Sequence, residues 1–331
     1  MIVFKSIKKL YNDTVAFVTI IGLAICMQWV YCIQECSEYA LMLGCLCGAI
    51  YFYLLLDSNF TYLRMILFIF MSVLAIYSQY GAVFIALPLL FLFFVKIIFN
   101  KTEMIKRKIF VTISYMASLL VFWLPLYYFF LSKQLERNGI SENTVGFSGK
   151  LLLDIPFTLG TILGYFFGVN SGSIWPTVLS VISVVLLVCC VILCLKKNVP
   201  WCKKSLVLTL LIGYVLHYLL VKLHIYAMVH PGQSAGFYAR YSYFYIPLLT
   251  VVLPILIIES KDFLIQGVEW KKYVVYVIVG CVASVSLFNT LENWNKALDD
   301  QFAQIWLENE GWNDVTYLYG VSYGFYYYLN P

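Results

Sequence analysis

The chain has 331 residues, of which 62% are hydrophobic and 12% are charged, and its formal net charge is +5. Soluble domains carry about 25% charged residues, so this composition excludes an ordinary soluble domain and indicates a membrane protein. The basic residues stand in short clusters between apolar runs, which also argues against nucleic-acid binding.

The chain opens with the basic segment "MIVFKSIKKLYNDT", which does not have the form of a cleavable signal peptide. Apolar runs of about 20 residues follow, the length of a helix that crosses a bilayer. They predict nine spans, at about 14–33, 39–56, 63–78, 80–99, 109–131, 174–195, 205–223, 242–258 and 273–290. The short "SQYG" at 78–81 joins the third and fourth spans into a hairpin.

Two further segments are not simple loops. In residues 133–173, apolar residues alternate at helical spacing with a polar stripe made of Lys150, Asp154, Thr158, Thr161 and Tyr165. This pattern predicts an amphipathic helix at about 154–168 that lies in the outer membrane interface, with Pro156 in its first turn. The tail, 291–331, contains a polar helical stretch, then "VTYLYG", which is typical of a strand, and "SYGFYYYL", which could open another helix.

These segments define the expected fold class, an all-α polytopic membrane protein with about nine transmembrane helices and an outer interfacial helix. We divide the chain into a transmembrane domain, 1–290, and the beginning of a small extracytoplasmic α/β domain, 291–331.

Lysine and arginine predict the orientation. Sixteen of them fall in one set of loops and six in the other. Cytoplasmic loops carry an excess of lysine and arginine, so the set with sixteen is predicted to be cytoplasmic. We therefore expect a multi-pass protein of a plasma membrane, bacterial in origin, with a cytoplasmic N-terminus and an extracytoplasmic C-terminus.

Ten cysteines are present, and seven of them lie inside apolar runs, where cysteine behaves as a small hydrophobic residue. No pair of cysteine or histidine residues has the spacing of a metal site. The sequence contains no cofactor motif, and a requirement for a divalent metal is left open.

The stretch "FYARYSYFYIPLL" places Arg240 among aromatic residues at the outer end of a span. Its guanidinium either anchors the helix in the interface or holds the phosphate of a lipid headgroup through its planar fork. Tyr241, Gln79, Tyr80 and His230 lie in outer segments too, and we assign them with Arg240 to substrate binding.

The first outer loop supplies two weak candidates for a catalytic base or metal ligand. Glu35 and Glu38 are three residues apart, so on a helix both could face one cleft. The alternative is that they are solvated residues at a helix start, where carboxylates are favoured.

The apolar interiors of the nine spans contain no Asp or Glu, which argues against an ion-coupled carrier. His217 is the titratable residue placed near the middle of a span. It is either hydrogen-bonded to a neighbouring helix or part of a proton relay.

The chain contains "QECSEYAL", "AIYSQYGAVFIALPLLFLF", "ARYSYFYIPLL" and "LENEGWNDVTYLYGVSYGFYYYL". These four motifs resemble the C superfamily of integral-membrane glycosyltransferases, the group that includes protein mannosyltransferases and aminoarabinose transferases, and the last is similar to the entrance of the family's outer C-terminal domain. "QECSEYAL" at 34–41 is similar to the family's short outer loop, without its usual arginine. "AIYSQYGAVFIALPLLFLF" is similar to the hairpin that follows, and "ARYSYFYIPLL" to a late element carried here by Arg240, Tyr241 and Pro247.

The resemblance implies transfer of a sugar from a polyprenyl-phosphate donor to an extracytoplasmic glycan, lipid or protein acceptor. The family's base lies in a long first outer loop that has no counterpart here, so the chain is expected to begin after the family's first spans and to stop early in the outer domain. The alternatives are a polysaccharide polymerase, a flippase for lipid-linked oligosaccharides, or a non-catalytic membrane subunit.

Overall fold

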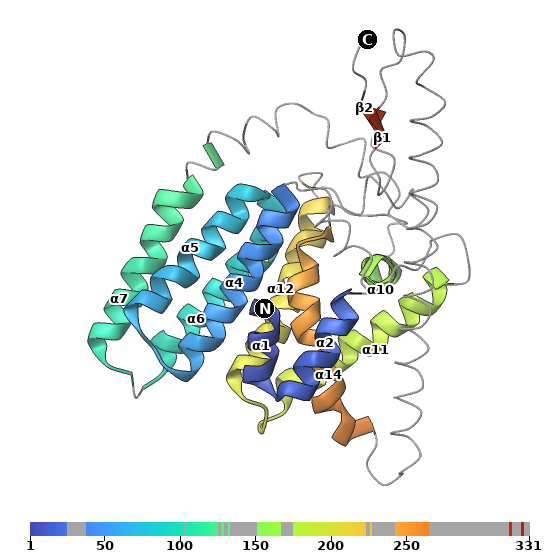
Figure 1. The fold of residues 1–331 in the computed structure, drawn as a ribbon, viewed down its shortest axis with the longest axis horizontal. Helices are drawn as coiled ribbons and strands as arrows, with labels where there is room; N and C mark the ends of the chain where they lie inside the picture. Colours follow the sequence, from blue (N-terminus) through green and yellow to red (C-terminus); the bar gives the residue numbers. More distant parts are fainter. Residues whose placement is uncertain are drawn as a thin grey trace.

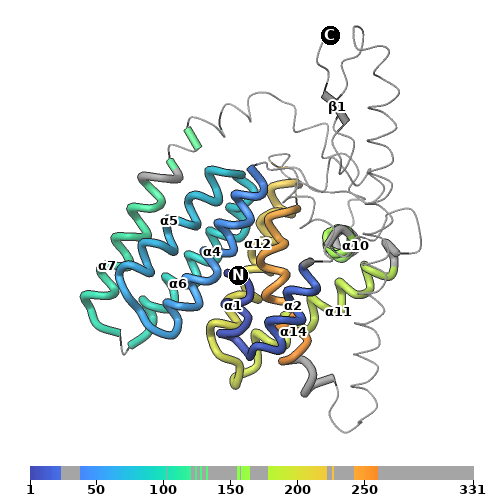
Figure 2. Tube along the Cα trace, viewed as in Figure 1, coloured from blue at the N-terminus to red at the C-terminus, as the bar shows by residue number. Residues whose placement is uncertain are grey.

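The computed structural model is a bundle of helices, most of which run side by side (Figures 1 and 2). The structure describes residues 1–24, 38–101, 103–124, 127–128, 132, 151–166, 175–222, 226, 242–264, 318–319 and 326–327.

Four described helices are long and apolar enough to cross a membrane. They are α4 (Glu38–Ser58), α6 (Val83–Phe99) together with the preceding 3-10 turn η1 (Tyr80–Ala82), α11 (Trp175–Leu195) and α12 (Trp201–Lys222). Each coincides with a predicted span, because an uninterrupted apolar run leaves the backbone no better choice than a helix in lipid. The structure thus supports four of the nine predicted spans by length and composition.

The remaining predicted spans have different outcomes. Shorter apolar helices match three of them: α2 (Asp13–Ala24), α5 (Tyr62–Ser78) and α14 (Tyr245–Leu264). The span predicted at 109–131 is described in part, as α7 (Ile105–Ala117) followed by the π-helical turn η2 (Ser118–Trp123). The ninth, at 273–290, lies outside the described residues.

The predicted hairpin at 78–81 is confirmed. The helix α5 begins after Thr61, whose side-chain oxygen accepts a hydrogen bond from the Arg64 amide at 3.3 Å, and it ends before Gln79. Gln79 then caps η1, and the chain returns through α6. This short connection places the residues of the hairpin tip at one end of the bundle.

The basic segment at the N-terminus forms a helix that was not predicted from the sequence, α1 (Ile2–Leu10). Val3 and Ile7, one turn apart, are 8% and 0% exposed, whereas Lys5 and Lys9 are exposed. The spacing of Val3 and Ile7 was the signal for this helix. The helix packs with its apolar side on the bundle and turns its lysines outward.

A helix is also found where the interfacial helix was expected, α10 (Leu151–Phe166), but two details were wrong. The helix begins three residues earlier than predicted, so Pro156 lies in the second turn. Thr158, assigned to the polar stripe, is 1% exposed and hydrogen-bonds to the Tyr214 hydroxyl of α12. A buried hydroxyl needs a partner, and the neighbouring helix supplies it.

Figure 1 shows α10 end-on while α4 to α7 are seen lengthwise, so α10 crosses the bundle helices at a steep angle. Its position in a membrane interface stays a prediction.

In the tail, β1 (Leu318–Tyr319) pairs antiparallel with β2 (Tyr326–Tyr327). The strand predicted in "VTYLYG" is confirmed at Leu318 and Tyr319. "SYGFYYYL" contributes its partner at Tyr326 and Tyr327, where a helix was considered. Two residues per strand do not establish the α/β domain expected at 291–331, which stays a prediction.

Candidate functional site

Aromatic side chains and a few polar ones meet at the end of the bundle that holds the hairpin tip. We call this set the aromatic cluster; its described members are Tyr39, Gln79, Tyr80, Phe84, His217, Tyr226, Tyr243, Phe244 and Tyr245. They come from α4, the hairpin, α6, α12, the chain after α12, and the start of α14 with the residues just before it. Segments far apart in the sequence therefore build one face.

Gln79 joins the hairpin to the first turn of α4. Its Oε1 accepts a hydrogen bond from the Gly81 amide at 2.9 Å, and its Nε2 lies 3.4 Å from the Tyr39 hydroxyl, near the upper limit for a hydrogen bond. The Tyr39 ring in turn meets the Tyr243 ring edge-on at 5.5 Å. One side chain thus connects two segments that the sequence assigned to the site.

The hairpin tip is held tightly against the same cluster. Tyr80 meets Tyr226 edge-on, with ring centroids 5.7 Å apart. A Cβ at Gly81 would lie 2.4 Å from the Tyr226 hydroxyl oxygen and 2.8 Å from the Phe244 ring, so only glycine fits there without a shift. The tip is therefore packed, and the position of Gln79 and Tyr80 is set by that packing.

His217 is fully buried in the cluster. Its ring stacks on Phe84 at 4.5 Å, and its Nδ1 lies 3.0 Å from the Tyr245 hydroxyl of α14. The structural interpretation, a histidine hydrogen-bonded to a neighbouring helix, is confirmed. His217 lies five residues before the end of the 22-residue α12, close to the hairpin tip.

The other predicted site residues have different outcomes. Glu38 is exposed and opens α4, as expected of a solvated carboxylate at a helix start. Glu35, His230, Arg240 and Tyr241 lie outside the described residues. The roles of all the predicted site residues stay predictions.

The chain is described again from Ser242, directly after Arg240 and Tyr241. Ser242 is 1% exposed, and its hydroxyl has no hydrogen-bond partner within the part of the chain that the structure describes.

No role was predicted from the sequence for Phe84, Tyr226, Phe244 or Tyr245. The density of aromatic residues in "FYARYSYFYIPLL" was a signal for Phe244 and Tyr245. Nothing in the spacing singled out Tyr226, whose place in the cluster depends on how the chain returns after α12.

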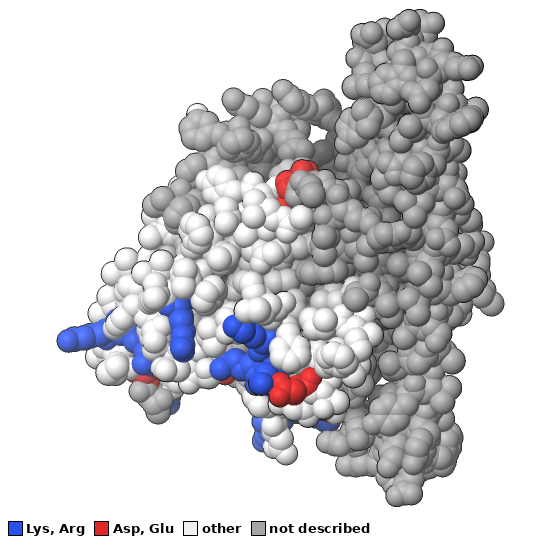
Figure 3. Space-filling view, viewed as in Figure 1, with Lys and Arg blue, Asp and Glu red and all other residues white. Residues whose placement is uncertain are grey.

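The opposite end of the bundle is basic. Lys and Arg gather along the lower edge of the bundle in Figure 3. On α4, Tyr39 and Asp57 are 18 residues apart, or about 27 Å along a helix, so the aromatic cluster and this basic end are well separated.

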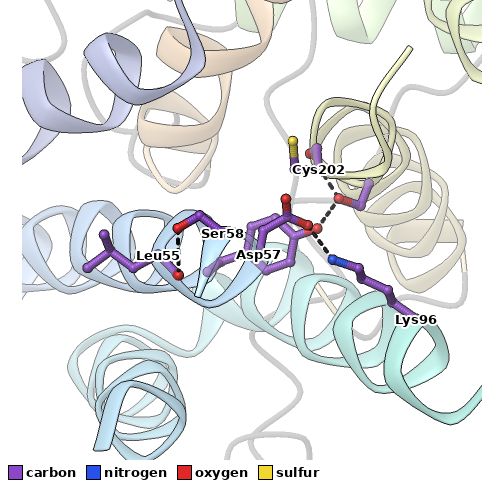
Figure 4. A network of polar contacts seen from close by, with 7 residues as sticks. Leu55, Asp57, Ser58, Lys96 and Cys202 are labelled. Carbon is purple, nitrogen blue, oxygen red and sulfur yellow. Dashed lines mark hydrogen bonds and ion pairs between the residues drawn. The ribbon is translucent and has the colours of Figure 1, made fainter. Parts of the chain in front are cut away.

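Carboxylates at the basic end are paired. Figure 4 shows Asp57 between Lys96 and Cys202, with its carboxylate 2.5 Å from the Lys96 ammonium. Glu259 of α14 lies 2.5 Å from the Lys203 ammonium, and Glu103 lies 2.5 Å from Arg107. The Asp57 and Glu259 pairs join neighbouring helices, and each of these three carboxylates is engaged by a cation.

Within the described residues, no group of three or more His, Cys, Asp or Glu could hold a metal ion. Six cysteines are described with free thiols: Cys45, Cys47, Cys189, Cys190, Cys194 and Cys202.

Comparisons with protein-family models, curated proteins and solved structures found no match for this chain.

Proposed function

We propose that the chain is a membrane glycosyltransferase that takes a sugar from a polyprenyl-phosphate donor and works at the aromatic cluster. The observation that supports this is the convergence of three motif segments. Gln79 of the hairpin reaches Tyr39 of the first motif at 3.4 Å. Tyr39 packs at 5.5 Å on Tyr243, which follows Arg240 by three residues in the third motif.

In this proposal, Arg240 binds the donor phosphate through its planar fork, which matches a phosphate bidentately. Tyr241, Gln79, Tyr80 and His230 contact the rest of the donor. Glu35 and Glu38 remain weak candidates for the base, and the acceptor is an extracytoplasmic glycan, lipid or protein. The N-terminus is cytoplasmic, so the basic end faces the cytoplasm and the aromatic cluster faces outward.

One observation favours a second candidate, a non-catalytic membrane subunit. Glu38 supplies the carboxylate found among the described residues of the aromatic end. It is exposed at the start of α4 and forms no ion pair with a described residue. General acid–base chemistry needs a group held within hydrogen-bond reach of the reacting atoms.

The test is donor affinity, measured by calorimetry on the full chain with a polyprenyl-phosphate sugar. A charge-assisted contact contributes roughly 1.5–3 kcal/mol, so Arg240→Ala should weaken binding about tenfold to a hundredfold. Arg240→Lys should restore part of it, since an ammonium cannot make the fork.

The control is Arg64→Ala at the basic end, where the Arg64 guanidinium donates to the Asn59 carbonyl at 2.7 Å. It should leave donor affinity unchanged. An Arg240→Ala variant that binds as tightly as the original chain would overturn the proposal. Binding that depends on Arg240, without transfer to any acceptor, would favour the non-catalytic subunit.

A further inference from the structure

The turn between α6 and α7 carries positive charge that the fold does not use. Arg107 is fully engaged, since it pairs with Glu103 at 2.5 Å and lies over the Phe60 ring at 4.5 Å. Lys101 and Lys106 are exposed, and neither forms an ion pair with a described carboxylate. Two ammonium groups are therefore available to an anion at this place.

An exposed apolar stripe starts beside these lysines. Ile105, Ile109 and Ile113 stand at successive turns of α7, on one face, and are 74%, 54% and 62% exposed. Phe99, the last residue of α6, is 77% exposed and precedes Lys101 by two residues. The charge and the stripe form one amphipathic surface.

We propose that this surface, made of Lys101, Lys106 and the stripe Ile105, Ile109 and Ile113, binds an anionic phospholipid. The lysines hold the headgroup phosphate, and an acyl chain lies along α7. A soluble acidic partner would match the lysines alone, whereas a lipid matches the lysines with its headgroup and the stripe with its acyl chain. This inference depends on the membrane location and is independent of the donor site.

A second basic element of the same end provides a contrast. Lys5 and Lys9 of α1 are exposed too, but the apolar face of α1 is buried, with Ile7 at 0% exposure. These lysines therefore carry equal charge without a comparable stripe. Substituting these lysines therefore distinguishes a specific lipid site from the general attraction of a basic surface for anions.

The experiment uses the full chain in detergent and native mass spectrometry, with phosphatidylglycerol and phosphatidylcholine of identical acyl chains as probes. The original chain should retain phosphatidylglycerol in preference to phosphatidylcholine. Lys101→Gln combined with Lys106→Gln should weaken phosphatidylglycerol binding by about thirtyfold, the effect of two lysines near a membrane surface. Lys5→Gln combined with Lys9→Gln should weaken it less than about threefold, as isolated surface charges do.

A second pair of variants tests the stripe. Ile109→Asn combined with Ile113→Asn should weaken binding of both lipids by about tenfold, because the acyl chain loses apolar contact area. Free glycerol phosphate should not displace the lipid. The proposal is overturned if the α1 variant loses as much affinity as the α6–α7 variant, if the stripe variant binds normally, or if glycerol phosphate competes.

Discussion

At the residue scale, Glu259 is where three separate parts of the described chain meet. Its Oε1 accepts hydrogen bonds from the Lys203 ammonium at 2.5 Å and the Tyr11 hydroxyl at 3.1 Å, and its backbone carbonyl accepts one from Lys196 at 3.0 Å. Burial, and then the Glu259 carboxylate, raise the pKa of Tyr11, so its hydroxyl stays a donor at neutral pH. Glu259 thereby connects α14 to α12 and to the end of α1.

We predict that Glu259→Gln destabilises the protein more than the loss of an exposed ion pair. The Lys203 and Glu259 side chains are 13% and 22% exposed, and removing the charge weakens two hydrogen bonds, at a cost of about 2 kcal/mol. Asp13→Asn is the matched control, because the Lys8–Asp13 pair is 55% and 66% exposed and should contribute less than about 1 kcal/mol. Thermal unfolding in detergent, followed by tryptophan fluorescence, measures both. Equal shifts in the midpoint would show that the Glu259 pair is ordinary surface charge.

At the scale of elements, the contact between α6 and α12 depends on a glycine. A Cβ at Gly213 would lie 2.0 Å from the Phe84 carbonyl oxygen, so the two backbones are in direct contact there. His217 stands one turn further along α12 and stacks on Phe84. The close approach therefore positions both the helix pair and the centre of the aromatic cluster.

Gly213→Ala should separate the two helices and destabilise the protein by about 1–3 kcal/mol, the usual cost of overpacking, or more because backbone must move. Gly44 of α4 is the control, since a Cβ there meets nothing within 4 Å. Gly44→Ala should be neutral or stabilising by up to about 1 kcal/mol, through helix propensity. The measurement is again the unfolding midpoint, with donor affinity as a second readout that should fall in Gly213→Ala alone. A Gly213→Ala variant as stable as Gly44→Ala would mean that the backbones are not in contact.

At the scale of the whole molecule, the sequence predicted the helices far better than their contacts. Apolar runs located α4, α6, α11 and α12 to within a few residues, because run length alone fixes a helix in lipid. Which residues of two neighbouring helices contact each other depends on how far each helix is shifted along its axis and rotated about it. A single sequence does not encode these two quantities locally. Thr158 was therefore assigned to the wrong environment.

The same limit applies to the candidate site. The order of the spans predicted that Tyr39, Gln79 and Tyr80 lie at one end of the molecule, and the structure places them there. That order did not identify Tyr226, which packs on Tyr80 and Phe84 because of the chain's return after α12. Span order predicts which residues share an end of the bundle, and packing decides which of them touch.

The orientation in the membrane is the last prediction, and the proposed sugar transfer outside the cell depends on it. The excess of lysine and arginine at one end predicts that this end is cytoplasmic, so Glu38, exposed at the other end, should face outward. In a chain whose ten native cysteines are replaced by alanine, an impermeant thiol reagent added to intact cells should label Glu38→Cys. It should label Lys101→Cys only after permeabilisation, because Lys101 lies in the exposed α6–α7 turn of the basic end. Labelling of Lys101→Cys in intact cells would reverse the orientation, place the aromatic cluster on the cytoplasmic side and remove the basis for sugar transfer outside the cell.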